Sequence, residues 1–191
     1  MTTVLFFCTA NVSVELIKEF VVESQKPEGT TNIWSLVRDP SQTEFDEGTV
    51  GPLDPVETGF LESSVDNLVK FMEGLPEEDE TIVNDTLVIL DGRSTRDKTV
   101  LIHHSVYEMP DDVEDGEWVD EKAIKSWKHW RVPFTSAAYL AMYLENNAYD
   151  FVKSWGFTAK KDNFVDQEGV LRLPTLPMKE FDMLDDDGWP A

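Results

Sequence analysis

Two short segments in the middle of the chain carry side chains suited to acid–base chemistry. Asp91 directly follows one apolar run, and His103, His104 and Tyr107 lie at the end of the next. A histidine with its ordinary pKa near 6.5 can accept a proton at neutral pH. We therefore name His103, His104 and Asp91 as candidate catalytic residues of an enzyme that needs no cofactor. Isomerisation, cyclisation, dehydration and hydrolysis are reactions that such a set could serve.

Cations and aromatic rings near these segments could bind a small organic ligand. Arg93 or Arg131 could hold a carboxylate or an enolate through two parallel hydrogen bonds. A segment that interleaves basic side chains with aromatic rings leads up to Arg131. The candidate ligand-binding residues are Arg93, Tyr107, Trp127, Trp130 and Arg131.

A structural role is the alternative for the same residues. Asp91 can pair with Arg93 or Arg96 and stiffen the turn, while one histidine packs in the core and the other faces solvent. Successive side chains of a strand point to opposite faces, so His103 and His104 cannot both bind one metal ion in a regular strand. This alternative favours a binding protein over an enzyme.

The sequence contains none of the familiar cofactor or metal motifs. It has no glycine-rich phosphate-binding loop, no serine-hydrolase elbow and no zinc-protease signature. One cysteine and three histidines exclude a cysteine-rich zinc site. Cys8 lies in an apolar run, which indicates an inert, buried thiol rather than a nucleophile. We expect no cofactor and no metal.

The candidate residues at 91 and 103–107 need two strands to position them. The runs 86–90 and 99–102 are rich in β-branched residues and too short for typical helices. The polar segment 91–98 between them predicts a hairpin with an elaborate loop. Because both runs are strongly apolar, we expect two central strands whose polar ends are gathered on one side.

The order of the N-terminal segments predicts a parallel pair of strands. The apolar run 4–10 is typical of a strand buried on both faces. Asn11 or Ser13 can cap the helix that follows, and 33–37 predicts the next strand. A strand, a helix and a strand in this order favour a right-handed crossover. A second amphipathic helix is predicted after a cap at Ser63.

The C-terminal half predicts further elements of the same domain. The segment 131–134 is typical of a short strand, which Pro133 confines to an edge or to a strand start. A helix follows, with its apolar stripe interrupted at Asn146 and Asn147, and 164–173 predicts a terminal hairpin. The fold class that results is α/β, a single domain over residues 1–173 with a central mixed β-sheet flanked by helices.

Three acidic segments stand apart from these elements. Residues 38–60 and 109–121 are predicted insertions, and the first is either a mobile flap over a site or a solvated loop. Residues 174–191 mix acidic and large apolar side chains, which predicts a tail that docks on its own domain or on a partner protein. The candidate partner-binding residues of the tail are Phe181, Leu184 and Trp189.

The charge of the chain limits its partners. The 191 residues include 38 acidic and 16 basic side chains, so the net charge is −22. Such a surface repels the phosphates of nucleic acids and the anionic surface of membranes. No run of residues approaches the 18 or more apolar residues that a membrane span needs, and no signal peptide is recognised. We expect a cytoplasmic protein with no nucleic-acid or membrane partner.

A family resemblance accompanies these inferences. Residues 87–94, the following apolar strand, residues 131–133 and a helix that ends with Asp150 and Phe151 resemble an uncharacterised α/β domain family of bacteria and fungi. The resemblance covers about residues 84–173 and implies the fold but no activity. The acidic loop and the tail of this chain depart from that family.

Two functions remain open on this basis. The first is an acidic intracellular binding or protein-interaction domain without cofactor, and it is the one the sequence favours. The second is a cofactor-independent small-molecule enzyme that uses histidine acid–base chemistry. A histidine within hydrogen-bond reach of Asp91 or Tyr107 would favour the second.

Overall fold

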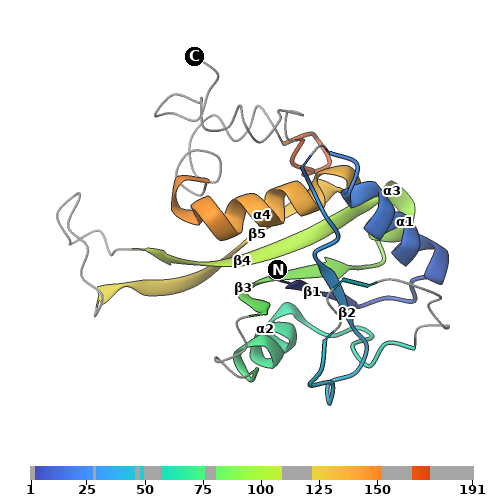
Figure 1. The fold of residues 1–191 in the computed structure, drawn as a ribbon, viewed down its shortest axis with the longest axis horizontal. Helices are drawn as coiled ribbons and strands as arrows, with labels where there is room; N and C mark the ends of the chain where they lie inside the picture. The colour runs from blue at the N-terminus through green and yellow to red at the C-terminus, as the bar shows by residue number, and fades with distance from the viewer. Residues whose placement is uncertain are drawn as a thin grey trace.

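A computed structural model describes residues 3–27, 29–45, 48–49, 57–75, 81–108, 122–151 and 165–172. Five strands form one sheet in the order β2-β1-β3-β4-β5 (Figure 1). The elements in chain order are β1 (Thr3–Cys8), α1 (Val14–Ser24), β2 (Trp34–Val37), α2 (Val65–Glu73), β3 (Ile82–Leu90), α3 (Ser94–Asp97), β4 (Thr99–Glu108), β5 (Ile124–Pro133) and α4 (Phe134–Phe151).

The sheet is mixed, as the sequence predicts. Strand β1 pairs in parallel with both β2 and β3. The two remaining pairs, β3 with β4 and β4 with β5, are antiparallel. The predicted central hairpin is therefore confirmed, since β3 and β4 lie next to each other inside the sheet. The loop between them contains the short helix α3.

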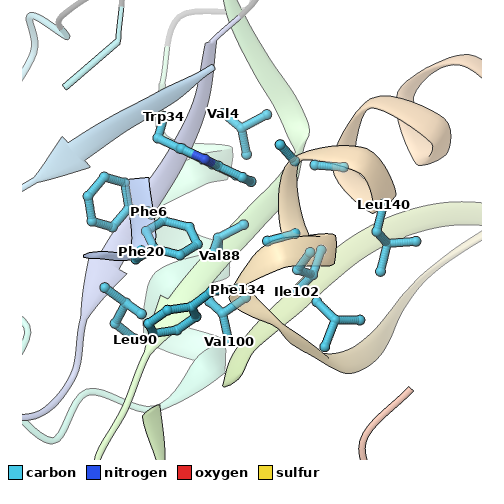
Figure 2. Packing of buried hydrophobic residues seen from close by; sticks show 14 of the residues in the cluster. Val4, Phe6, Phe20, Trp34, Val88, Leu90, Val100, Ile102, Phe134 and Leu140 are labelled. Atoms are coloured by element: carbon cyan, nitrogen blue, oxygen red, sulfur yellow. The ribbon is translucent and has the colours of Figure 1, made fainter. Parts of the chain in front are cut away.

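Helices cover the two faces of the sheet separately. Helices α1 and α4 pack on one face, and α2 packs on the other (Figure 1). Phe6, Phe20, Trp34 and Phe134 meet in the larger hydrophobic cluster beneath α1 and α4 (Figure 2). Ser24 Oγ accepts a hydrogen bond of 2.7 Å from the indole N–H of Trp34, so burial leaves this donor satisfied. The α/β fold class is confirmed.

The first helix begins at one of its two predicted caps. Ser13 is the N-cap of α1, and its hydroxyl accepts a hydrogen bond from the Leu16 N–H. The predicted cap of α2 is wrong by one residue. Ser64, not Ser63, has the extended backbone of a cap and accepts from the Asn67 N–H. Either serine satisfies the sequence preference, and only backbone geometry selects between them.

Two further boundaries differ from the prediction. Helix α4 continues through Asn146 and Asn147 to Phe151. Asparagine costs well under about 1 kcal/mol in a helix interior, which the burial of Leu140 and Leu144 on the sheet outweighs. Strand β5 begins at Ile124 rather than near Arg131, because the whole basic and aromatic segment pairs with β4. Pro133 ends this edge strand, as expected for a proline.

The described part of the 38–60 insertion packs against one edge of the sheet. The Thr49 N–H donates to the Trp34 carbonyl, and Thr49 Oγ1 accepts from the Leu36 N–H. Phe60 is buried in the cluster under α2. Unpaired strand edges invite aggregation, and here the insertion covers the outer edge of β2. These contacts do not distinguish a mobile flap from a solvated loop, so both alternatives stay open.

The described C-terminal residues lie beside the opposite edge. Val165 and Leu171 form an antiparallel bridge, as the predicted terminal hairpin requires, and Val170 forms a parallel bridge with Arg131 of β5. The insertion 109–121 and the tail 174–191 lie outside the described residues. None of the described helices is long and apolar enough to cross a membrane.

Candidate functional site

The two neighbouring histidines of β4 point to opposite faces of the sheet. His104 lies on the α4 side, where its Nδ1 is 2.7 Å from Thr86 Oγ1. Burial lowers the pKa of His104, and the nearby carboxylates of Asp85 and Glu145 oppose this effect. Because His104 is only 1% exposed, it is a hydrogen-bonded core histidine and not an accessible base.

His103 lies on the other face, in the same row of the sheet as His129 of β5. The two residues are directly opposite in the β4–β5 register, and their ring centres are 5.3 Å apart. His103 is 6% exposed, and its Nε2 atom has no hydrogen-bond partner among the described residues. Burial lowers the pKa of His103 to about 4, and the charges of His129 and Arg131 contribute. His103 is therefore neutral at pH 7.

Asp91 forms its ion pair with Arg131, across the sheet. Arg131 Nη1 donates to Asp91 Oδ1 at 3.3 Å, and Nη2 donates to Oδ2. Arg131 Nη1 also donates to Thr99 Oγ1 at 3.1 Å. The pairing of Asp91 with Arg93 or Arg96 that the structural alternative assumed is therefore wrong. Its wider expectation, a carboxylate that stiffens the turn, agrees with the geometry.

The turn after β3 is held by the same carboxylate. Asp91 Oδ1 accepts hydrogen bonds of 3.0 Å from the backbone N–H groups of Arg93 and Ser94, and one of 3.1 Å from the Ser94 hydroxyl. Burial alone would raise the pKa of Asp91, but the Arg131 and Ser94 hydrogen bonds outweigh it and lower the pKa. Asp91 is thus a fully engaged anion, which makes it a poor proton acceptor.

Arg93 is occupied locally as well. Its Nε donates to Asp97 Oδ2 at 2.5 Å, and its Nη2 lies 3.9 Å from Glu168 Oε2. The first contact lies within the α3 turn, and the second joins this turn to the loop between Val165 and Val170. Of the two arginines proposed to bind a ligand, each therefore has a carboxylate partner within the chain.

The predicted aromatic residues divide between the two faces of the sheet. Trp130 is buried in the cluster under α4. Trp127 lies on the His103 face, half-buried, with Lys125 Nζ 5.6 Å from its ring centre. Tyr107 lies on this face too, opposite Lys125 in the register, and it is 52% exposed. The structure thus places Tyr107, Trp127, His103 and Arg131 on one face of the sheet, spread along β4 and β5, and it places Trp130 and His104 on the other face.

One residue of this face was missed by the sequence analysis. His129 lies 26 positions from His103 in the chain, so only the β4–β5 register shows that the two residues are neighbours. The apolar residues Ile124, Trp127 and Trp130 recur every third position, so the sequence carries little of the two-residue alternation that would have predicted a strand there. The described residues contain no cluster of three or more histidine, cysteine, aspartate or glutamate side chains that could hold a metal ion.

No protein-family model, no curated protein and no solved structure matches this chain. The resemblance of residues 84–173 to an uncharacterised α/β family therefore stays a prediction. The candidate partner-binding residues Phe181, Leu184 and Trp189 lie outside the described residues. The site has to be interpreted from its own geometry.

Proposed function

We propose that this chain is a non-catalytic protein-interaction domain. It binds a partner protein through the end of the paired strands β4 and β5, the β4–β5 ribbon, where Tyr107 and Glu108 lie opposite Lys125 and Ile124. The supporting observation is the exposure of two large apolar side chains there. Tyr107 is 52% exposed and Ile124 is 57% exposed. The β4–β5 register places them at neighbouring positions on opposite faces of the ribbon, so the proposed partner contacts both faces of its end. Tyrosine is enriched at protein interfaces because it combines a large apolar ring with a polar tip.

The shape of the ribbon supports the same proposal. Strand β3 pairs with β4 only as far as His104, whereas the pairing of β4 with β5 continues to Glu108. The last two-stranded section therefore extends beyond the rest of the sheet (Figure 1). A protruding ribbon offers a partner both side-chain contacts and easy access, which a buried strand does not.

The candidate acid–base residues are ion-paired or buried, which also favours binding over catalysis. Asp91 and Arg131 neutralise each other, and His104 is buried on the side of the sheet that α4 covers. A general base works best with a pKa near the working pH, whereas His103 has a pKa of about 4. These residues hold the fold together, and the proposal assigns them no chemical step.

The proposal includes a cytoplasmic location and a protein partner, with no nucleic acid, no membrane and no cofactor. The net charge of −22 disfavours phosphate backbones and anionic lipid surfaces. Phe181, Leu184 and Trp189 of the acidic tail are proposed as a second contact with a partner. A fluorescent fusion of the full chain, followed in the cells that produce it, tests the location.

Site-specific photo-crosslinking tests the docking surface. The full chain carries a photoreactive phenylalanine in place of Tyr107 and is irradiated in the cells that produce it. The matched control carries the same group in place of Val22, which is 59% exposed on α1. Helix α1 lies at the opposite end of β4 from the protruding section (Figure 1). We expect one discrete adduct from position 107, lost when Ile124→Asp is added. Equal labelling from both positions, or none from position 107, would contradict the proposal.

A second candidate function has one observation in its favour. His103 Nε2 is buried without a hydrogen-bond partner among the described residues, as a group that meets a ligand often is. A cofactor-independent enzyme of the isomerase, cyclase, dehydratase or hydrolase type would use it. A thermal-shift screen of small carboxylic acids tests this candidate. It requires a ligand that stabilises the wild type but not His103→Gln, and failure to find any such ligand argues against it.

A further inference from the structure

The pair formed by His103 and His129 has the spacing of two imidazoles that share one metal ion. An ion held tetrahedrally at about 2.1 Å from one nitrogen of each ring places the ring centres about 5 Å apart. The observed separation is 5.3 Å, between side chains directly opposite on neighbouring strands. Cross-strand neighbours are held in place by the backbone ladder, so this spacing costs little further ordering.

One ring nitrogen of this pair, which could coordinate a metal ion, has no hydrogen-bond partner among the described residues. His103 Nε2 is buried and forms no hydrogen bond with any described residue, which costs free energy in the absence of a ligand. His129 is exposed, so its ring can turn toward an ion that arrives from solvent.

We propose that His103 and His129 bind one divalent transition-metal ion of the class that prefers imidazole, such as Cu²⁺ or Zn²⁺. Late first-row ions favour nitrogen donors, whereas Mg²⁺ and Ca²⁺ favour carboxylate oxygens. Two protein ligands leave coordination positions for water or for a group on a bound partner. The ion would tie β4 to β5 beside the protruding section of the ribbon.

The charges around the pair allow a cation to bind. Arg131 lies on the same face, and its positive charge opposes a cation beside His103, although the ion pair with Asp91 offsets part of that charge. Lys125 lies two residues before Trp127 on the same strand face, where its ammonium group is directed at the indole ring. The net charge of −22 gives the chain a field that attracts cations.

Titration with Zn²⁺ and Cu²⁺ in millimolar Mg²⁺ tests the site in the full chain. The Mg²⁺ occupies carboxylate sites, and electron paramagnetic resonance of the Cu²⁺ form reports the number of coordinated imidazole nitrogens. We expect one equivalent to bind at micromolar concentration with two nitrogens in the spectrum. His129→Ala should weaken binding at least tenfold, and Lys125→Ala, on the same face of β5, should leave it unchanged or slightly tighter.

Two results would overturn the proposal. One is wild-type binding that His129→Ala leaves unchanged, which assigns the ion to carboxylates. The other is the lack of any nitrogen-coordinated Cu²⁺ in the wild type. Because His129 is exposed, its replacement leaves the fold intact, and far-ultraviolet circular dichroism checks this. His103→Gln gives a second measurement with the same expected loss.

Discussion

Burial raises the pKa of Asp91, whereas its contacts with Arg131 and Ser94 lower it, and the lowering is the larger effect. The carboxylate is held by Arg131 and by two backbone N–H groups of the turn. Removing one member of such a pair leaves the other charge poorly solvated, which is costly even where replacing both would be neutral. At the scale of single residues, the polar groups that resemble a catalytic set are therefore stabilising contacts.

The two arginines of this corner differ in burial, which allows a matched comparison. The Arg131 side chain is 10% exposed, whereas that of Arg93 is 29% exposed in its pair with Asp97. We expect Arg131→Ala to lower the free energy of unfolding by about 2 kcal/mol. Arg93→Ala should cost less than about 1 kcal/mol, because exposed ion pairs contribute little. Urea denaturation at pH 7 measures both, and equal losses would contradict the assigned roles.

The low pKa of His103 predicts a dependence of stability on pH. In the unfolded chain the histidine takes up a proton near pH 6.5, whereas in the folded chain it does so only near its pKa of about 4. The unfolded state therefore binds more protons between these values, and stability falls as the pH drops through this window. Wild type should lose roughly 3 kcal/mol from this group between pH 7 and pH 4.

The variant His103→Gln isolates this contribution. Its free energy of unfolding should change less with pH than that of wild type over the same window, measured by urea denaturation at pH 7, 5.5 and 4.5. His104, whose pKa is also lowered, remains in both proteins and contributes equally to each. Parallel curves for the two proteins would show that His103 does not titrate as described.

At the scale of elements, short side-chain contacts decide where helices begin. Ser13 and Ser64 both accept a backbone hydrogen bond from the third residue after them. Ser63, the residue predicted as a cap, donates its backbone N–H to the Phe60 carbonyl and lies before the helix. A difference of one position thus separates a stabilising serine from a neutral one.

Replacing each serine by alanine tests this assignment. Ser64→Ala should lower the free energy of unfolding by about 0.5 to 1 kcal/mol, because a bare N–H group at the start of α2 loses its acceptor. Ser63→Ala should change it by no more than a few tenths of a kcal/mol. Chemical denaturation of the two variants side by side gives the comparison, and a larger loss from Ser63→Ala would restore the original prediction.

At the scale of the whole molecule, the described sheet closes two hydrophobic clusters, one on each face. The larger cluster draws on β1, β2, β3, β4, β5, α1 and α4, and the smaller one on β1, β2, β3, α2 and Phe60. Cooperative unfolding of small domains depends on such contiguous cores. The acidic tail has a composition that cannot build a core by itself.

Deletion of residues 174–191 is therefore expected to leave one cooperative unfolding transition. The melting temperature should change by only a few degrees, because the described residues already form both clusters. Differential scanning calorimetry of the full and shortened chains measures this. A broad or absent transition in the shortened chain would show that the tail belongs to the core.

The sequence by itself determined the fold class, the parallel N-terminal pair, the central hairpin and the opposite orientation of His103 and His104. Periodicity and turn residues encode these features locally, within a few positions of each other. Only the tertiary structure decided that Asp91 pairs with Arg131 and that His103 faces His129. Those contacts depend on the register of distant strands, which is set when both faces of the sheet pack at once.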